Sequence, residues 1–222
     1  MQDQLTTALL RCGVIAGPLY ILVGAIQVLI RPGFDVRYNV LSQMALGDLG
    51  WIQTANFAVC GLLVLAGAIG IGRALRSGRG ATWAPRLIGI YGAGLVGAAI
   101  FSADPGFGFP PGTPAGMPTT MSTHALIHFA LGGIAFFSII GACFVLARRF
   151  GKNGEHGWAR YSAFTGAFFL VAFLGTASGS GLVVFTLALW VGIGLAWVWL
   201  SAVSARLIAD PARAARPSAA LI

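Results

Sequence analysis

The sequence predicts an all-α fold: a polytopic transmembrane bundle of six helices with short cytoplasmic loops and two longer structured outer loops. Hydrophobic residues make up 57% of the 222-residue chain and charged residues only 9%, which leaves too few polar groups to cover a soluble protein. The apolar residues gather into six runs. The 14 Lys and Arg residues are divided very unequally between the two sides of these runs.

Each apolar run is close to the roughly 20 residues that a helix needs to cross about 30 Å of hydrocarbon. The runs cover residues 12–30, 52–72, 84–103, 125–147, 160–177 and 182–205. Strands would need alternating polarity in a closed barrel, whereas these runs are apolar on every face. The fifth and shortest run is joined to the sixth by residues 178–181, which predicts a tight hairpin. No segment is polar enough for a second domain, so residues 1–222 form one integral membrane domain.

The basic residues predict the orientation. Arg31 and Arg37 lie on one side, and the other side carries Arg11, Arg73, Arg76, Arg79, Arg86, Arg148, Arg149, Lys152, Arg160, Arg206, Arg213 and Arg216. Because cytoplasmic loops retain Lys and Arg, we expect both termini in the cytoplasm and a location in the plasma membrane. A net charge of +8 could also suit nucleic acid, but these residues lie near span ends, where anionic headgroups attract them. Membrane lipids are therefore the expected partners, and nucleic acid is not.

The first outer segment, residues 31–51, mixes charges with apolar and aromatic side chains and is too apolar to float free. We expect a short helix around residues 41–46 that lies at the membrane interface. Tyr38 and Trp51 would belong to the interfacial aromatic belt.

The second span begins with polar side chains. Asp48 precedes it and could cap its N-terminus. Gln53 and Asn56 are three residues apart on one helical face, so we expect them to hydrogen-bond to neighbouring helices.

The second outer segment, residues 104–118, contains five prolines and four glycines and has no Lys or Arg. Proline stiffness and glycine turns favour a shaped lid, and Phe107 and Phe109 give this lid apolar groups to bury. The alternative is a solvated linker.

Ionisable residues gather where the outer segments meet the spans. His124 and His128 are four apart on one helical face, and Asp104 ends the preceding span. Because ionisable groups at membrane depth usually face the bundle interior and need partners, these three residues and the Asp35/Arg37 pair are the ligand-binding candidates. Alternatively, one histidine reaches the headgroups and the other hydrogen-bonds a backbone carbonyl.

Five short motifs resemble the prokaryotic integral membrane proteins grouped as domain of unknown function 998 (DUF998). They are RPGFD at 31–35, GWIQTANF at 50–57, FSADP at 101–105, FPPGTP at 109–114 and HALIH at 124–128. The resemblance covers the outer half of the first four spans, and similar hydrophobicity continues to the C-terminus. It implies a six-helix membrane protein without an assigned biochemical activity.

Two classes of function fit these residues. The first, which we favour, is a non-enzymatic bundle without a cofactor that binds a lipid, a small ligand or a partner membrane protein through an outer vestibule. The alternative is an intramembrane hydrolase in which zinc, held by Asp104, His124 and His128, activates water. His156 lies on the cytoplasmic side, so Asp104 would have to be the third ligand. A transporter is less favoured because the middles of the spans carry essentially no charge.

Overall fold

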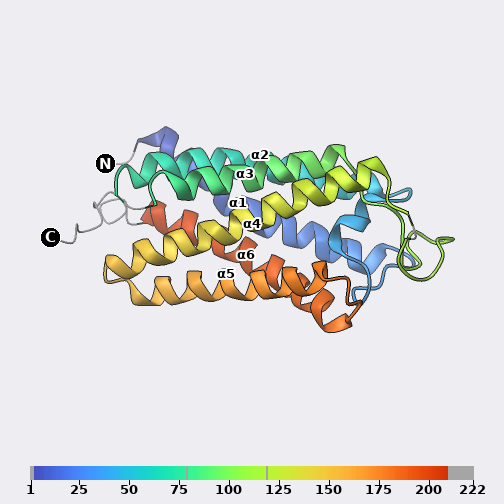
Figure 1. Cartoon of the computed structure of the whole chain (residues 1–222). Coiled ribbons are helices and arrows are strands. Elements are labelled where there is room, and N and C mark those ends of the chain that lie inside the picture. The colour runs from blue at the N-terminus through green and yellow to red at the C-terminus, as the bar shows by residue number, and fades with distance from the viewer. Residues whose placement is uncertain (1–2, 79, 119, 210–222) are drawn as a thin grey trace.

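The computed structural model describes residues 3–78, 80–118 and 120–209, which fold into six α-helices and one short 3₁₀ helix (Figure 1). In chain order these are α1 (Gln4–Ile30), η1 (Leu41–Ala45), α2 (Gly50–Leu75), α3 (Trp83–Ile100), α4 (Thr123–Lys152), α5 (His156–Ala177) and α6 (Val183–Ala209). Each predicted run falls on one α-helix, so the six-helix bundle is confirmed. The third helix, however, ends at Ile100 and not at residue 103, because Phe101 is extended.

Helix α1 begins well before the predicted apolar run, at Gln4. Asp3 caps it by accepting a hydrogen bond from the backbone N–H of Thr6 at 2.6 Å, and it also pairs with Arg73 at 3.0 Å. This polar first turn is helical without being apolar, which is why hydropathy alone did not reveal it. Helices α1, α2, α3, α4 and α6 are long and apolar enough to cross a bilayer, whereas α5 does not meet the same criterion of length and hydropathy.

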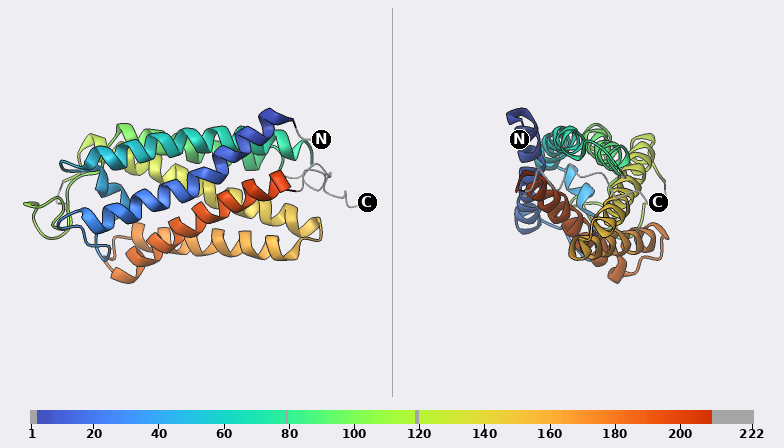
Figure 2. Two further views of the ribbon diagram at one scale, coloured as in Figure 1. Left: turned by 180° about the vertical axis from the view of Figure 1, so that it is seen from behind. Right: turned by 90° about the vertical axis from the view of Figure 1, so that its left-hand side faces the viewer.

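The helices form a ring. Each α-helix packs against the next one in the chain, and α6 closes the ring against α1, as the end-on view in Figure 2 shows. Trp197, Trp199 and Phe169 are among the large side chains that are fully buried. Helices α1 and α2 approach closely at Gly67, where a Cβ atom would lie 2.9 Å from the Cα atom of Gly13. Such contacts between small residues hold helices together in a membrane, where the lipid is as apolar as the side chains.

The bundle has two different ends. The terminal end carries the start of α1, the α2–α3 and α4–α5 connections and the end of α6 (Figure 1). The loop end, opposite, carries residues 31–49, 101–122 and 178–182. Of the basic residues used to predict the orientation, Arg79, Arg213 and Arg216 lie outside the described residues.

The short helix expected around residues 41–46 is present as η1, but its expected position at the membrane interface is wrong. Leu41, Gln43 and Met44 are buried, and η1 packs against α2 inside the ring. Its apolar side chains close the loop end of the ring, where they are removed from water and lipid together. Tyr38 and Trp51 remain exposed, as belt aromatics should be.

The expected cap of α2 is also wrong. The residue at the N-cap position is Leu49, no side chain caps this helix, and Asp48 is exposed. The expectation for Gln53 and Asn56 is confirmed. The Gln53 Oε1 atom accepts a hydrogen bond from Gln27 Nε2 of α1 at 2.8 Å, and Asn56 Nδ2 donates to the Tyr20 carbonyl oxygen at 3.4 Å.

Candidate functional site

Arg31 holds η1 in place at the loop end. The residue follows directly after α1, is only 7% exposed, and donates hydrogen bonds to the carbonyl oxygens of Met44, at 3.0 Å, and Leu46. Its guanidinium carbon lies 5.2 Å from the centre of the Phe109 ring. Burial lowers the pKa of Arg31, and the negative charge of Asp48 opposes that shift. A guanidinium nevertheless stays protonated in proteins, so a buried positive charge fastens the two outer segments together.

Asn39 and Gln43 make a second connection between the outer segments. Both side-chain amides donate to the carbonyl oxygen of Gly106, Asn39 Nδ2 at 3.3 Å and Gln43 Nε2 at 3.4 Å. The carbonyl oxygen of Asn39 accepts a hydrogen bond from Trp190 Nε1 of α6 at 3.1 Å. Polar groups from residues 31–49, from residues 104–118 (the Pro-rich segment) and from α6 therefore form hydrogen bonds with one another at the loop end.

The Pro-rich segment packs as the predicted lid. Phe109 is fully buried and meets the Phe34 ring edge-on, with ring centres 5.1 Å apart, whereas Phe107 is half-buried. The backbone N–H of Phe107 donates to Gly116 at 2.7 Å, and that of Gly108 donates to Pro114 at 3.1 Å. This internal hydrogen bonding gives the segment a defined shape, unlike a solvated linker.

Asp104 connects the end of α3 to the start of α4. Its carboxylate accepts hydrogen bonds from the backbone N–H of Ser122, at 2.7 Å, and from the Ser122 hydroxyl, at 2.6 Å. The Ser122 hydroxyl in turn accepts from the backbone N–H of Ala125 and caps α4. The two bonds from Ser122 lower the pKa of Asp104, and a smaller effect comes from the nearby charge of His124.

The two histidines have different surroundings. His124 is exposed, and its ring centre lies 5.4 Å from that of Phe101. His128 is 5% exposed, and its Nδ1 atom lies 2.8 Å from the carbonyl oxygen of Phe101. Of the two predicted arrangements, this geometry matches the one with an outward histidine and a histidine on a backbone carbonyl.

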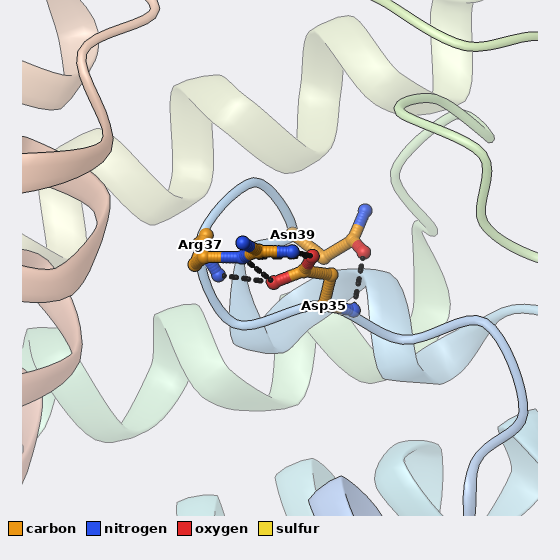
Figure 3. A network of polar contacts seen from close by, with 3 residues as sticks. All are labelled: Asp35, Arg37 and Asn39. Carbon is orange, nitrogen blue, oxygen red and sulfur yellow. Dashed lines mark hydrogen bonds and ion pairs between the residues drawn. The ribbon is translucent and has the colours of Figure 1, made fainter.

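Asp35 and Arg37 form an ion pair within one turn of the first outer segment (Figure 3). The Arg37 Nη2 atom lies 2.6 Å from Asp35 Oδ2, and the backbone N–H of Asp35 donates to Asn39 Oδ1 at 2.9 Å. The polar and ring contacts of this pair within the described residues are with Tyr38, with Asn39 and with each other. They therefore shape their own turn and do not join the Asp104 group.

A pocket of about 510 Å³ lies between the Pro-rich segment and the start of α4. Its polar lining includes Asp104 and Ser122 together with two threonines, and its apolar lining includes Met117 and Met121. No Lys or Arg lines it among the described residues. A carboxylate and hydroxyls therefore stand beside flexible apolar side chains at the mouth of the bundle.

The donors named for the zinc alternative are engaged elsewhere. Among residues 3–78, 80–118 and 120–209, no group of three or more His, Cys, Asp or Glu side chains is arranged to hold a metal ion. His128 Nδ1 is turned to Phe101, and both carboxylate oxygens of Asp104 are bonded to Ser122. Catalytic zinc takes three protein ligands, and the residues do not fit that requirement as they lie.

The sequence did not predict that four residues connect the outer segments and α6 at the loop end. They are Arg31, Asn39, Gln43 and Trp190. Two signals were present in the chain: a lone arginine directly after an apolar helix, and two amide side chains four residues apart in an apolar segment. The contacts of Asn39 and Gln43 with Gly106, and of Asn39 with Trp190 of α6, are formed by the tertiary structure and are not visible in either signal.

Six helices arranged in a ring, five of them long and apolar enough to cross a bilayer, define a multi-pass integral membrane protein. A family model described as protein of unknown function (DUF998) matches residues 14–206. The chain belongs to the DUF998 family, as its five motifs indicated. No curated protein and no solved structure matches it.

Proposed function

We propose that the protein lies in the plasma membrane with its loop end outside and both termini in the cytoplasm. The distribution of basic residues supports this orientation. Of the described ones, only Arg31 and Arg37 belong to the loop end, whereas the terminal end carries Arg11, Arg73, Arg76, Arg86, Arg148, Arg149, Lys152, Arg160 and Arg206. Short cytoplasmic loops retain such residues.

In this orientation the protein is a non-enzymatic binding bundle, and the loop-end pocket is its outer vestibule. The pocket carries the proposal because its volume of about 510 Å³ lies within the range of about 300–1,000 Å³ that is typical of small-molecule sites. A partner protein would need a contact surface of roughly 800 Å² on each side. The pocket therefore favours a lipid or a small ligand over a partner membrane protein.

The lining of the pocket indicates the ligand's charge. The hydrogen bonds from Ser122 lower the pKa of Asp104, so this carboxylate is ionised at neutral pH, and no Lys or Arg among the described residues lines the pocket beside it. Met117 and Met121 offer an adaptable apolar wall to the rest of the ligand. A lipid or small ligand that carries an amine meets both requirements, whereas an anionic ligand would face the carboxylate directly.

Lipid retention in native mass spectrometry tests this proposal. The full chain is placed in nanodiscs that contain equal amounts of a lipid with an ethanolamine headgroup and a lipid with a glycerol headgroup. It should retain about threefold more of the ethanolamine lipid than of the glycerol lipid. Asp104→Asn should remove this preference, whereas Asp48→Asn, which changes an exposed acid at the same end, should keep it. Equal retention of both lipids by the unaltered protein, or a preference that survives Asp104→Asn, would rule out the vestibule as the site.

A further inference from the structure

A layer of polar side chains lies inside the ring, toward the loop ends of α1 and α2. It is formed by Gln27 near the end of α1, by Gln53 and Asn56 near the start of α2, and by Tyr20 and Trp197. Gln27, Gln53 and Trp197 are 0% exposed, and Tyr20 and Asn56 are also buried. A Cβ atom at Gly24, one turn before Gln27, would lie 3.5 Å from the Leu41 Cδ1 atom, so η1 lies beside this part of α1.

Hydrogen bonds and ring contacts join these residues into one group. Gln53 Oε1 accepts hydrogen bonds from Gln27 Nε2 at 2.8 Å and from Asn56 Nδ2 at 3.3 Å. Asn56 also donates to the Tyr20 carbonyl oxygen, and the Tyr20 ring stacks on Trp197 with centres 4.3 Å apart. The ring of Tyr91 in α3 is also close to Trp197, with ring centres 5.5 Å apart. Four helices therefore meet at this layer.

Three polar atoms of the layer have no hydrogen-bond partner among the described protein atoms. They are Gln27 Oε1, Gln53 Nε2 and Trp197 Nε1, which together offer one acceptor and two donors. A buried polar group without a partner costs roughly 1–3 kcal/mol, and native proteins keep few of them. Three in one connected group indicate that another molecule supplies the partners.

We propose that this layer is a second ligand site, for a small uncharged molecule that carries both a hydrogen-bond acceptor and a donor. The ligand is uncharged because the layer holds no Lys, Arg, Asp, Glu or His, and an ion without a partner is costly at this depth. It accepts from Gln53 Nε2 and Trp197 Nε1 and donates to Gln27 Oε1. Alcohols and amides have this chemistry, either as free solutes or as part of a lipid.

Two probes distinguish the sources: acetamide, a water-soluble amide, and 1-dodecanol, a long-chain alcohol. Each is titrated against the full chain in detergent while the unfolding temperature is measured. A rise of about 3 °C or more with acetamide indicates a free solute, and the same rise with 1-dodecanol indicates a lipid. The double variant Gln27→Met, Gln53→Met keeps the side-chain volumes nearly constant and should lose the shift.

Thr165→Val is the matched control, because it removes a buried unpartnered hydroxyl from α5, outside the layer, and should keep the shift. If the double variant does not fold, Trp197→Phe, which removes one of the donors, replaces it. Native mass spectrometry of the purified protein should also find a retained uncharged molecule that the variant lacks. Equal responses of the wild type and the variant to both probes, with no retained molecule, would overturn the proposal and leave water as the only occupant.

Discussion

The carboxylate of Asp104 accepts both polar hydrogens of Ser122, the backbone N–H at 2.7 Å and the hydroxyl at 2.6 Å. The same hydroxyl caps α4 through the backbone N–H of Ala125 at 3.1 Å. One acid therefore fixes the end of α3, the start of α4 and one wall of the pocket.

Asp104→Asn should lower the free energy of unfolding in detergent by about 1 kcal/mol, because a neutral amide accepts more weakly and cannot accept both bonds equally well. Asp48→Asn, at an exposed residue that caps nothing, should change it by less than about 0.5 kcal/mol. Chemical denaturation measures both. Equal effects of the two substitutions would contradict a structural role for Asp104.

The contribution of Asp104 should also depend on pH. Its pKa in the folded protein is below the ordinary value of 3.8, so the stabilisation is fully present above that value and is lost as the pH falls through the folded pKa. The unfolding temperatures of the wild type and Asp104→Asn should therefore converge in acid. A difference that stays constant from pH 7 to pH 2 would mean that the charge does not matter.

Arg31→Lys should destabilise the protein by about 1–2 kcal/mol, because an ammonium cannot reproduce the planar fork that reaches the carbonyl oxygens of Met44 and Leu46. Arg37→Lys is the matched control. Its ion pair with Asp35 is exposed, so the expected loss is smaller than that of Arg31→Lys. Thermal unfolding compares the two, and equal losses would show that Arg31 does not hold η1.

Phe109→Ala should release the Pro-rich lid, because it removes a fully buried ring from Phe34 and Arg31 and costs about 3 kcal/mol. Hydrogen exchange of residues 105–118 should become faster in this variant, and Phe107→Ala, at a half-buried residue, should have a smaller effect. Free-coil exchange of this segment already in the wild type would contradict a packed lid.

Cysteine labelling in a Cys12→Ser background tests the proposed orientation. Ala115→Cys, in the Pro-rich segment, should react with an impermeant reagent in intact cells, and Ser77→Cys, in the α2–α3 connection, should react only after permeabilisation. The remaining native cysteines, Cys60 and Cys143, are buried. The opposite pattern would invert the topology.

Metal analysis addresses the hydrolase alternative. Protein purified without a histidine tag should contain no stoichiometric zinc, because Asp104 and His128 are held by Ser122 and Phe101. One zinc ion per chain that is lost in His124→Ala or His128→Ala would instead support the zinc hydrolase.

The sequence by itself determined the six helices, the family and the interhelical role of Gln53 and Asn56. These features follow from local composition, because a span must be apolar along its whole length and a polar residue within it must find a partner on another helix. The burial of Phe109 followed in the same way, since a large ring in a stiff segment gains free energy when it leaves water.

Only the tertiary structure decided which residues meet at the loop end. Asp48 is a residue type that commonly caps helices and precedes α2, but it does not cap that helix. Ser122 does cap α4, and its hydroxyl is held by Asp104, which is 18 residues earlier in the chain. The segment with η1 was expected at the membrane surface, yet it lies inside the ring, because η1 buries the apolar side chains of Leu41 and Met44 by packing there against α2. The free energy gained by this burial depends on how the helices are assembled, so no local pattern in the sequence predicts it.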